Sequence, residues 1–313
     1  MENIGMAHVH TSLYKGCNSI ILENEWVKVE VVPSLGGKIV SILYKPSGKE
    51  WMLDSGERQL EQPMYGSTFT DWDMSGWDEC FPTIIACPSG VDNEISLPDH
   101  GELWALPWEY VIEKNEVVCT VKSPKLPYRF TRRISFVNND RIRLGYSAEN
   151  NGEKPIPFLW VPHPQFAITE STRILLPDSI QQVLCVDGGA KLKIGESYLW
   201  YDISLVSPEV TGDARKLYYD GKVPLGWSGL YEELSRNYLI MSVPPDKVPY
   251  IGVWIDEGLY NDRVTCALEP SIGYYDSLET AMGNQTAQII PARNSFEWYL
   301  ELTIGVGDWS KVI

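Results

Sequence analysis

Short runs of β-branched and aromatic residues, divided by turn-forming residues, recur along most of this 313-residue chain. The first three runs are 19–22, 26–32 and 38–44, and polar or glycine-rich segments such as 34–37 separate them. Val, Ile, Trp and Tyr favour strands, and turns at this spacing favour antiparallel neighbours. The pattern therefore predicts that the chain begins as an antiparallel meander.

The same pattern continues to the other end of the chain. We expect further strands at 108–113, 117–122, 128–137, 141–149, 158–161, 172–176, 239–243, 250–255, 264–268, 286–290 and 295–304. Apolar residues at helical spacing are rare, and one short helical turn is expected at 277–282. Because no linker or repeat divides the sequence, we predict an all-β fold, a large antiparallel β-sandwich in which two large sheets form a single domain over residues 1–313.

Charge narrows the classes of function. The chain has 42 acidic and 26 basic residues, a formal net charge of -16 at pH 7. Such a charge repels nucleic acid and anionic membrane surfaces, so a neutral or cationic small molecule is the expected partner. No apolar segment has the length of a signal-peptide core near the N-terminus, and none has the length of a membrane span. We expect a soluble cytoplasmic protein, monomeric or homodimeric.

Cysteine and aromatic residues add two expectations. The six cysteines are scattered without C-x-x-C spacing, which favours buried free thiols in a reducing compartment. The 12 tryptophans and 17 tyrosines fit a protein that binds sugars, because sugar rings stack on aromatic side chains. Aromatic residues also fill β-sandwich cores, so this second indication is weak.

Two aromatic, acid-rich segments, 68–82 and 97–104, interrupt the strand pattern. Long loops on a rigid β scaffold are common places for a binding or catalytic site. The second segment contains His100, which lies between Asp99 and Gly101 where the chain must turn tightly. Both segments are therefore expected to contribute to a site.

The other three histidines differ in their surroundings. His163 lies between two prolines, which hold it in an extended conformation at the end of the run 158–161. His8 and His10 form an H-x-H pair, but no third ligand is spaced to complete a metal site, and a solvated tail is expected. A lone histidine is more often structural than functional, so His100 and His163 need a partner to indicate chemistry.

Glu269 is a candidate for that partner. It follows the apolar run 264–268 and directly precedes Pro270. Because proline cannot donate to a strand ladder, we expect the strand to end at Glu269 and the carboxylate to lie at the rim of a sheet. A carboxylate among apolar neighbours can act as a general base, although a solvated glutamate before a turn is the simpler interpretation of this segment alone.

Taken in order, several short segments resemble the galactose mutarotase-like superfamily, in particular the aldose 1-epimerases and hexose-phosphate mutarotases. The segments are 33–42, Cys80-Phe81-Pro82, Asp99-His100-Gly101, His163-Pro164-Gln165-Phe166, Cys266-Ala267-Leu268-Glu269-Pro270 and 298–302. The resemblance implies a β-sandwich of large antiparallel sheets whose concave face holds a sugar. It also implies that no cofactor is required.

The resemblance assigns roles to three residues. Mutarotation opens a pyranose by removing the proton of the anomeric hydroxyl while the ring oxygen is protonated, and then closes the ring on the other face. By similarity, Glu269 is the base at O1 and His163 the acid at O5. His100 is a second donor that orients and polarises O5.

Departures from the family pattern bear on the substrate. Hexose-phosphate mutarotases commonly have Phe-Ala-Arg after Asp-His-Gly, with the arginine near the phosphate, whereas Glu102, Leu103 and Trp104 follow here. The stretch 77–79 adds two further acids before Cys-Phe-Pro. We therefore expect a free aldose or an unusual sugar and not a sugar phosphate. The candidates for sugar contacts, each of which could instead be a core residue or a turn cap, are Asp78, Glu79, Trp104, Trp254 and Asp256.

Two other functions remain open. A carbohydrate-binding protein could keep the same fold without turnover, since a fold does not fix a function. A glycosidase could use Glu269 with a loop acid such as Asp78, but this leaves the two histidines without a task. The identity of the sugar and its preferred anomer stay open as well.

Overall fold

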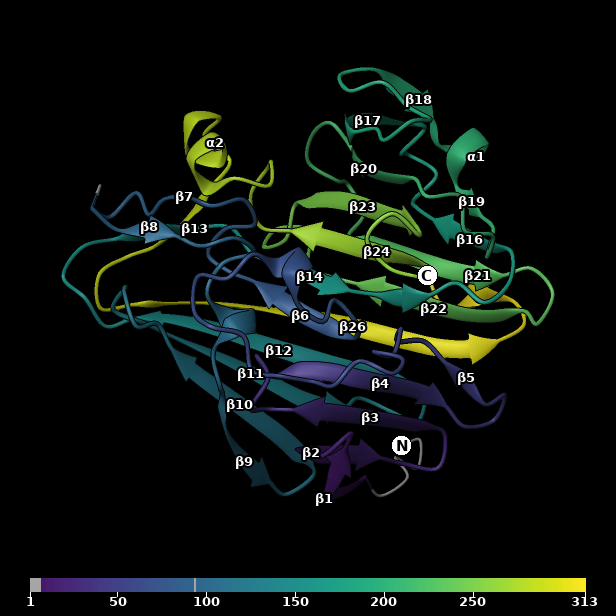
Figure 1. The fold of residues 1–313 in the computed structure, drawn as a ribbon, viewed down its shortest axis with the longest axis horizontal. Coiled ribbons are helices and arrows are strands. Elements are labelled where there is room, and N and C mark those ends of the chain that lie inside the picture. The colour runs from purple at the N-terminus through teal and green to yellow at the C-terminus, as the bar shows by residue number, and fades with distance from the viewer. Residues whose placement is uncertain (1–6, 93) are drawn as a thin grey trace.

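The computed structural model describes residues 7–92 and 94–313, and most of this chain lies in antiparallel β-strands (Figure 1). Register pairs such as Leu144 with Leu300 and Gly252 with Glu269 align neighbouring strands along the large sheets. The architecture is the predicted large antiparallel β-sandwich.

One layer of the sandwich is a nine-stranded sheet. Its strands, in spatial order, are β19 (Leu205–Val206), β16 (Thr172–Leu175), β21 (Trp227–Glu232), β22 (Asn237–Ser242), β26 (Ser295–Val306), β12 (Arg141–Asn150), β11 (Tyr128–Phe136), β10 (Glu116–Lys122) and β9 (Glu109–Glu113). Along β11, β12 and the first half of β26, buried side chains alternate with more exposed ones, as expected for an antiparallel sheet with one face packed on the core.

Two further large sheets face this layer in the described part of the chain. The seven-stranded sheet consists of β1 (His8–Tyr14), β2 (Cys17–Glu23), β3 (Val27–Val32), β4 (Lys38–Tyr44), β6 (Trp77–Cys80) and β14 (Val161–Pro164), with β5 (Lys49–Glu50) paired to β4. The six-stranded sheet consists of β15 (Phe166–Ala167), β24 (Val264–Ser271), β23 (Tyr250–Glu257), β20 (Ala214–Tyr218), β17 (Gln182–Asp187) and β18 (Ser197–Leu199).

Short elements complete the fold. They are the strand pairs β13 (Ile156–Phe158) with β25 (Gln288–Ile290) and β7 (Cys87–Pro88) with β8 (Ser96–Leu97), the α-helices α1 (Trp200–Ile203) and α2 (Leu278–Gly283), and the 3-10 helices Phe69–Asp71, Leu103–Ala105 and Trp309–Lys311. The helical turn expected at 277–282 is α2, whose N-cap side chain, Ser277, accepts a hydrogen bond from the Thr280 amide.

The layers meet around a cluster of buried aromatic rings. Tyr146 and Trp298 stack with ring centroids 5.3 Å apart, and Trp160 contacts both rings from the facing layer. Phe81 and Phe130 continue the cluster. Because such rings bury large apolar areas, this cluster fixes the layers against each other and supports the strands that carry the site.

The structure corrects the expected end of the strand at Glu269. β24 continues through Pro270 to Ser271, so Glu269 lies inside the sheet and is fully buried. Ile272 donates its amide to Trp160 on the side away from β23. Backbone N–H groups point to alternate sides along a strand, so the nitrogen of Pro270, two residues before Ile272, also faces away from β23. On that side β15 pairs only with Thr265 and Cys266. The missing N–H of Pro270 therefore removes no hydrogen bond to β23.

Other expectations are also revised. The layer opposite the nine-stranded sheet is two sheets and not one, and they approach each other where β14 contacts β24. The run 158–161 is divided between β13 and β14, and residues 77–80 of the first expected loop form strand β6. His8 and His10 lie on the paired strand β1 and not in a solvated tail, although both side chains are exposed.

The expectations for the cysteines and for membrane-spanning segments can be compared with the structure. The six cysteines are free, five of them buried and Cys17 half-buried. In the described ranges, no helix has the length and apolar character that crossing a membrane requires. Residues 1–6, which belong to the segment expected to lack a signal peptide, lie outside the described residues.

Candidate active site

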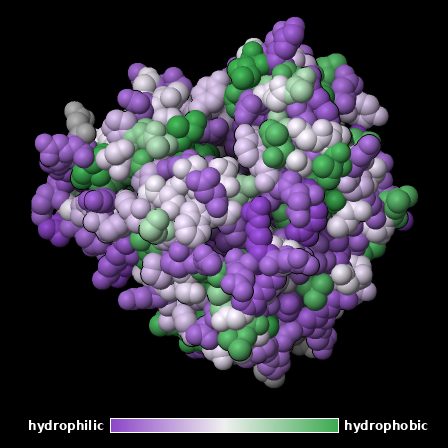
Figure 2. Space-filling model, in the orientation of Figure 1, coloured by the Kyte–Doolittle hydropathy of each residue, from purple (hydrophilic) through white to green (hydrophobic). Residues whose placement is uncertain are grey.

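A cavity of about 210 Å³ opens between the seven-stranded and six-stranded sheets. In Figure 2 the surface is notched between the part that carries α2 and the part that carries β17 and β18. The residues that line the cavity are Phe69, Thr70, Met74, Ile84, Ile85, His100, His163, Gln165, Asp187, Lys216, Trp254, Asp256, Tyr260, Asn261, Glu269 and Asp276.

Glu269 lies at the floor of this cavity, on β24. One carboxylate oxygen, Oε2, accepts a hydrogen bond from Nζ of Lys216. The other oxygen, Oε1, is buried and has no hydrogen-bond partner among the described residues. It lies 3.8 Å from Nε2 of His163. A buried carboxylate with one oxygen hydrogen-bonded and the other without a partner is arranged to accept a proton as a general base.

His163 reaches the cavity from β14, where Pro162 and Pro164 keep the backbone extended. Its Nδ1 lies 3.2 Å from Nε2 of Gln165, so the amide donates to Nδ1 and the proton of the neutral ring is on Nε2, toward Glu269. Burial of the imidazole, together with nearby cationic groups, holds the pKa of His163 well below its usual range. The ring is therefore neutral near pH 7 before a substrate binds.

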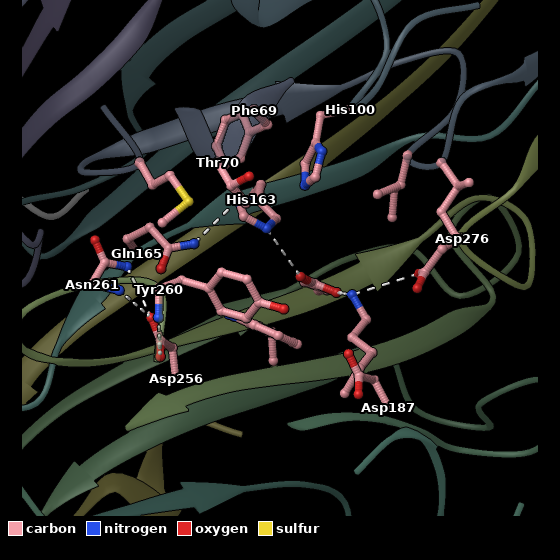
Figure 3. A pocket seen from close by; sticks show the side chains of 16 residues that line it. Phe69, Thr70, His100, His163, Gln165, Asp187, Asp256, Tyr260, Asn261 and Asp276 are labelled. Atoms are coloured by element: carbon pink, nitrogen blue, oxygen red, sulfur yellow. Dashed lines mark hydrogen bonds and ion pairs between the residues drawn. The ribbon is translucent and has the colours of Figure 1, made fainter. Parts of the chain in front are cut away.

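His100 is held from two directions. Its Nδ1 donates to Oδ1 of Asp99 at 2.9 Å, and its ring stacks on Phe69 with centroids 4.2 Å apart. Asp99 also accepts the Phe69 amide through Oδ2 at 2.8 Å. His100 and His163 lie edge to face with centroids 5.2 Å apart. The hydrogen bond at Nδ1 leaves Nε2 of His100 for a ligand, and Figure 3 shows both imidazoles on the same side of the cavity.

The turn that carries His100 explains the glycine that follows it. His100 has a φ of 56° and Gly101 a φ of 73°, both in the left-handed region. A Cβ on Gly101 would lie 2.2 Å from the carbonyl oxygen of Phe81. Only glycine permits this close approach of two backbones, which places His100 at the cavity.

Lys216 and Asp276 belong to the site but were not predicted. Lys216 comes from β20 and is buried, and its Nζ lies 3.6 Å from Oδ1 of Asp276 in addition to its contact with Glu269. The same Asp276 oxygen accepts the hydroxyl of Tyr218. Burial lowers the pKa of Lys216, and the Asp276 carboxylate opposes that shift. No motif marks either residue in the sequence, and β20, which carries Lys216, was not among the expected strands.

Trp254 and Asp256, two of the expected sugar contacts, also line the cavity. Asp256 is fully buried and accepts the amides of Leu259 at 2.8 Å and Asn261 at 2.9 Å, which fixes the loop after β23. Trp254 and Tyr260 approach with ring centroids 5.7 Å apart. Asp256 therefore shapes the wall, and the aromatic pair offers an apolar surface to a ligand.

Asp78, Glu79 and Trp104, three of the expected sugar contacts, lie outside the cavity lining. Asp78 is buried against Lys38 with 2.6 Å between Oδ2 and Nζ. Burial raises the pKa of Asp78, and Lys38 opposes that shift. Trp104 packs behind Phe69 and donates its Nε1 to the Asp99 carbonyl. This ring supports the site without reaching the cavity.

Glu79 is occupied in the core. Its Oε1 accepts from Arg132 at 3.0 Å and from Tyr146 at 2.9 Å, and its Oε2 accepts from Trp160 at 2.9 Å. A buried carboxylate needs such partners, and these come from strands distant in sequence. Glu79 is therefore a structural residue of the interior and not a ligand contact.

No group of three His, Cys, Asp or Glu side chains in residues 7–92 and 94–313 is arranged to hold a metal ion. The chemistry that the lining can supply is proton transfer by a carboxylate and two imidazoles, with a buried ammonium beside the carboxylate.

The sequence matches no family model and no curated protein. The structure resembles a galactose mutarotase-like protein from Clostridium acetobutylicum, with 12% identity, a TM-score of 0.70, and 96% of this chain and 99% of that chain covered. A galactose mutarotase related enzyme from Lactobacillus acidophilus has 16% identity and a TM-score of 0.65, covering 92% and 97%. A galactose mutarotase-like protein from Lactobacillus casei ATCC 334 has 15% identity and a TM-score of 0.66, covering 92% and 100%. The chain therefore has the galactose mutarotase-like fold.

Proposed function

We propose that the protein is a mutarotase, an aldose 1-epimerase that interconverts the α and β anomers of a free aldose. The observation that carries the proposal is the position of Glu269 Oε1, buried, unpartnered among the described residues and 3.8 Å from His163 Nε2 at the floor of a cavity. A protein that only binds a sugar has no need of a base and an acid side by side. The mutarotase names of proteins with the same fold support the proposal.

The proposed reaction uses two proton transfers. Glu269 Oε1 takes the proton of the O1 hydroxyl, the O1 electron pair forms the C1 carbonyl, and the C1–O5 bond breaks as His163 delivers a proton to O5. Rotation about C1–C2 presents the other face of the aldehyde, and the reverse transfers close the ring. Because each group ends in the form in which it began, no cofactor is consumed.

His163 acts as the acid in its imidazolium form. A lowered pKa makes the imidazolium a stronger proton donor, although that form is scarce near pH 7. Gln165 can serve both forms of the ring, because its Nε2 donates to the neutral Nδ1 and its Oε1 is buried with no partner among the described residues. Rotation of the amide would present Oε1 to the Nδ1–H of the imidazolium.

A free aldose fits the charges of the lining better than a sugar phosphate. The lining contains four carboxylates, those of Asp187, Asp256, Glu269 and Asp276. Among the described residues that line the cavity, Lys216 is the only lysine or arginine. Lys216 already contacts Glu269 and lies close to Asp276. A phosphate would therefore meet like charge without a free cation to pair with.

Of the two acids named for the glycosidase alternative, Glu269 lines the cavity and Asp78 does not. Asp78 lies on strand β6, outside the lining, and its Oδ2 is paired with Lys38. The carbohydrate-binding alternative needs an experiment. Purified anomers of common aldoses are mixed with the protein, and interconversion is followed by polarimetry and by NMR saturation exchange.

A mutarotase accelerates interconversion of at least one free aldose above the buffer rate. Loss of that acceleration in Glu269→Gln assigns it to the site. If sugars bind to the protein, as measured by calorimetry, and none interconverts faster than in buffer, the protein is a carbohydrate-binding module and the mutarotase proposal is wrong.

A further inference from the structure

We propose that Lys216 is a positioning residue for Glu269, whose buried ammonium keeps the carboxylate ionised and directs Oε1, the free oxygen, toward the substrate. The inference rests on the proposed mutarotase reaction, in which Glu269 takes the O1 proton. Lys216 donates to Oε2, whereas Oε1 has no partner among the described residues. The ammonium therefore distinguishes the two oxygens of one carboxylate.

The location of Glu269 makes a cation necessary. The side chain is fully buried, and burial favours the neutral form of a carboxylic acid, which cannot accept a proton from a hydroxyl. A second carboxylate, that of Asp276, lies close by and would strengthen this effect by repulsion. Lys216 contacts Glu269 and lies 3.6 Å from Asp276, so a single ammonium faces both carboxylates and reduces the repulsion between them.

The sheet leaves space for this ion pair. Lys216 is opposite Trp254 in the ladder of β20 and β23, and Gly252 is opposite Glu269 in the ladder of β23 and β24. A Cβ on Gly252 would lie 3.3 Å from Oε2 of Glu269 and 2.8 Å from the ring of Tyr218. The glycine on the middle strand thus allows the side chains of the two outer strands to meet across it.

Few other charges face the pair. Tyr218 of β20 lies under the ammonium, with Nζ 5.3 Å from the ring centroid, and its hydroxyl binds Asp276. Among the described residues, the other titratable side chains that line the cavity are those of His100, His163, Asp187, Asp256, Tyr260 and Asp276, and Cys80 lies near the ammonium. Burial keeps His163 neutral near pH 7, and Lys216 is the only lysine or arginine of this lining, so no other lysine or arginine there can replace its charge.

Three substitutions separate charge from shape. Lys216→Gln removes the charge but keeps a hydrogen-bond donor for Oε2, Lys216→Met removes both at similar length, and Lys216→Arg keeps the charge. The matched control is Lys49→Gln, because Lys49 is another buried lysine that donates to a buried carboxylate, Glu232, outside the cavity lining. For each protein, kcat/KM for anomer interconversion of a neutral aldose is measured across pH, together with Tm.

The expected result is a change in the shape of the pH profile. The acid limb of kcat/KM moves to higher pH by about one to three units in Lys216→Gln and Lys216→Met, the range over which a neighbouring opposite charge acts on a carboxyl group. The loss of kcat/KM relative to the wild-type protein is therefore largest at low pH and shrinks as the pH rises. Lys216→Arg and Lys49→Gln keep the limb of the wild-type protein.

An unchanged acid limb in Lys216→Gln, or a loss by the same factor at every pH, overturns the inference, because a purely structural role predicts either result. Should Lys216→Met fail to fold, Lys216→Gln decides the question, since it leaves Oε2 with a donor. A wild-type protein that does not accelerate interconversion refutes the proposed function instead. The two failures are therefore distinguishable.

Discussion

Oε1 of Glu269 lies 3.8 Å from Nε2 of His163, although the two residues belong to different sheets. β24 carries the carboxylate and β14 carries the imidazole, and the two strands contact each other where the seven-stranded and six-stranded sheets approach. The relative position of the proposed base and acid is therefore set by the packing of two rigid sheets. Preorganisation of this kind favours proton transfer, because little motion is needed to align the groups.

Glu269→Gln is expected to abolish most of the anomer interconversion. The amide has the shape of the carboxylate but cannot accept the O1 proton, and loss of one proton-transfer group typically costs ~10²–10⁴ in rate. Polarimetry of a freshly dissolved anomer measures the loss. Glu232→Gln is the matched control, because Glu232 is a buried carboxylate paired with Lys49 outside the cavity lining. Equal activity of the two variants would contradict the assignment of Glu269 as the base.

His163→Asn is expected to make the folded protein less sensitive to acid. Because the pKa of His163 is lower in the folded protein than in the unfolded chain, the unfolded chain binds this proton first as pH falls. Stability from this group is present above the ordinary histidine pKa and is lost as pH falls toward the folded value, by at most about 1.4 kcal/mol per pH unit.

The measurement is the free energy of unfolding in denaturant at a series of pH values from neutral downward. The wild-type protein should lose more stability than His163→Asn over this interval. His8→Asn is the control, since His8 is exposed on β1, and it should follow the wild-type curve. A curve for His163→Asn parallel to that of the wild type would show that the buried imidazole does not resist protonation.

Local sequence marked the two histidines of the cavity as candidates and the family resemblance assigned their roles, but local sequence placed Glu269 in the wrong environment. His100 is marked by the glycine after it and His163 by the prolines around it, and both constraints act within one or two residues. Whether a strand passes through Pro270 depends on which neighbours lie on each side, and that information comes from β23, β15 and Trp160, far away in sequence.

Charged residues were the main source of error for the same reason. Lys216 lies in a strand that is buried throughout, next to Arg215, and neither residue suggests a buried strand when the sequence is considered alone. Their partners, Glu269 and Glu257, come from other strands. Asp78 and Glu79 show the opposite case. The sequence suggests that they are available for a ligand, whereas in the fold they form ion pairs with Lys38 and Arg132.

The kcat/KM for a sugar 6-phosphate is expected to be at least about tenfold lower than that for the same sugar without phosphate. A tenfold difference corresponds to about 1.4 kcal/mol of electrostatic repulsion. The carboxylates of the lining supply the repulsion. Asp187 is exposed and lines the cavity, so Asp187→Asn should narrow the difference in kcat/KM between the two sugars. Added salt should narrow it as well. Faster conversion of the phosphate at low salt would contradict the preference for a free aldose.

Gly101→Ala is expected to destabilise the protein and to reduce the interconversion rate together, since this glycine fixes the turn that carries His100. An alanine in the left-handed region costs roughly 1–2 kcal/mol, and its Cβ would also meet the carbonyl oxygen of Phe81 at 2.2 Å. The Phe81 carbonyl accepts the amide of Glu102, so the backbone on both sides of the contact must shift.

Gly16→Ala is the matched control for this substitution. Gly16 also has a positive φ, 87°, but a Cβ there meets nothing within 4 Å, so only the backbone conformation is penalised. Denaturant unfolding should show a larger loss for Gly101→Ala than for Gly16→Ala, and only Gly101→Ala should lower kcat/KM at a temperature where both variants are folded. If the two variants lose equal stability and keep equal activity, the contact between Gly101 and Phe81 does not position His100, and the imidazole must be held by Asp99 and Phe69 alone.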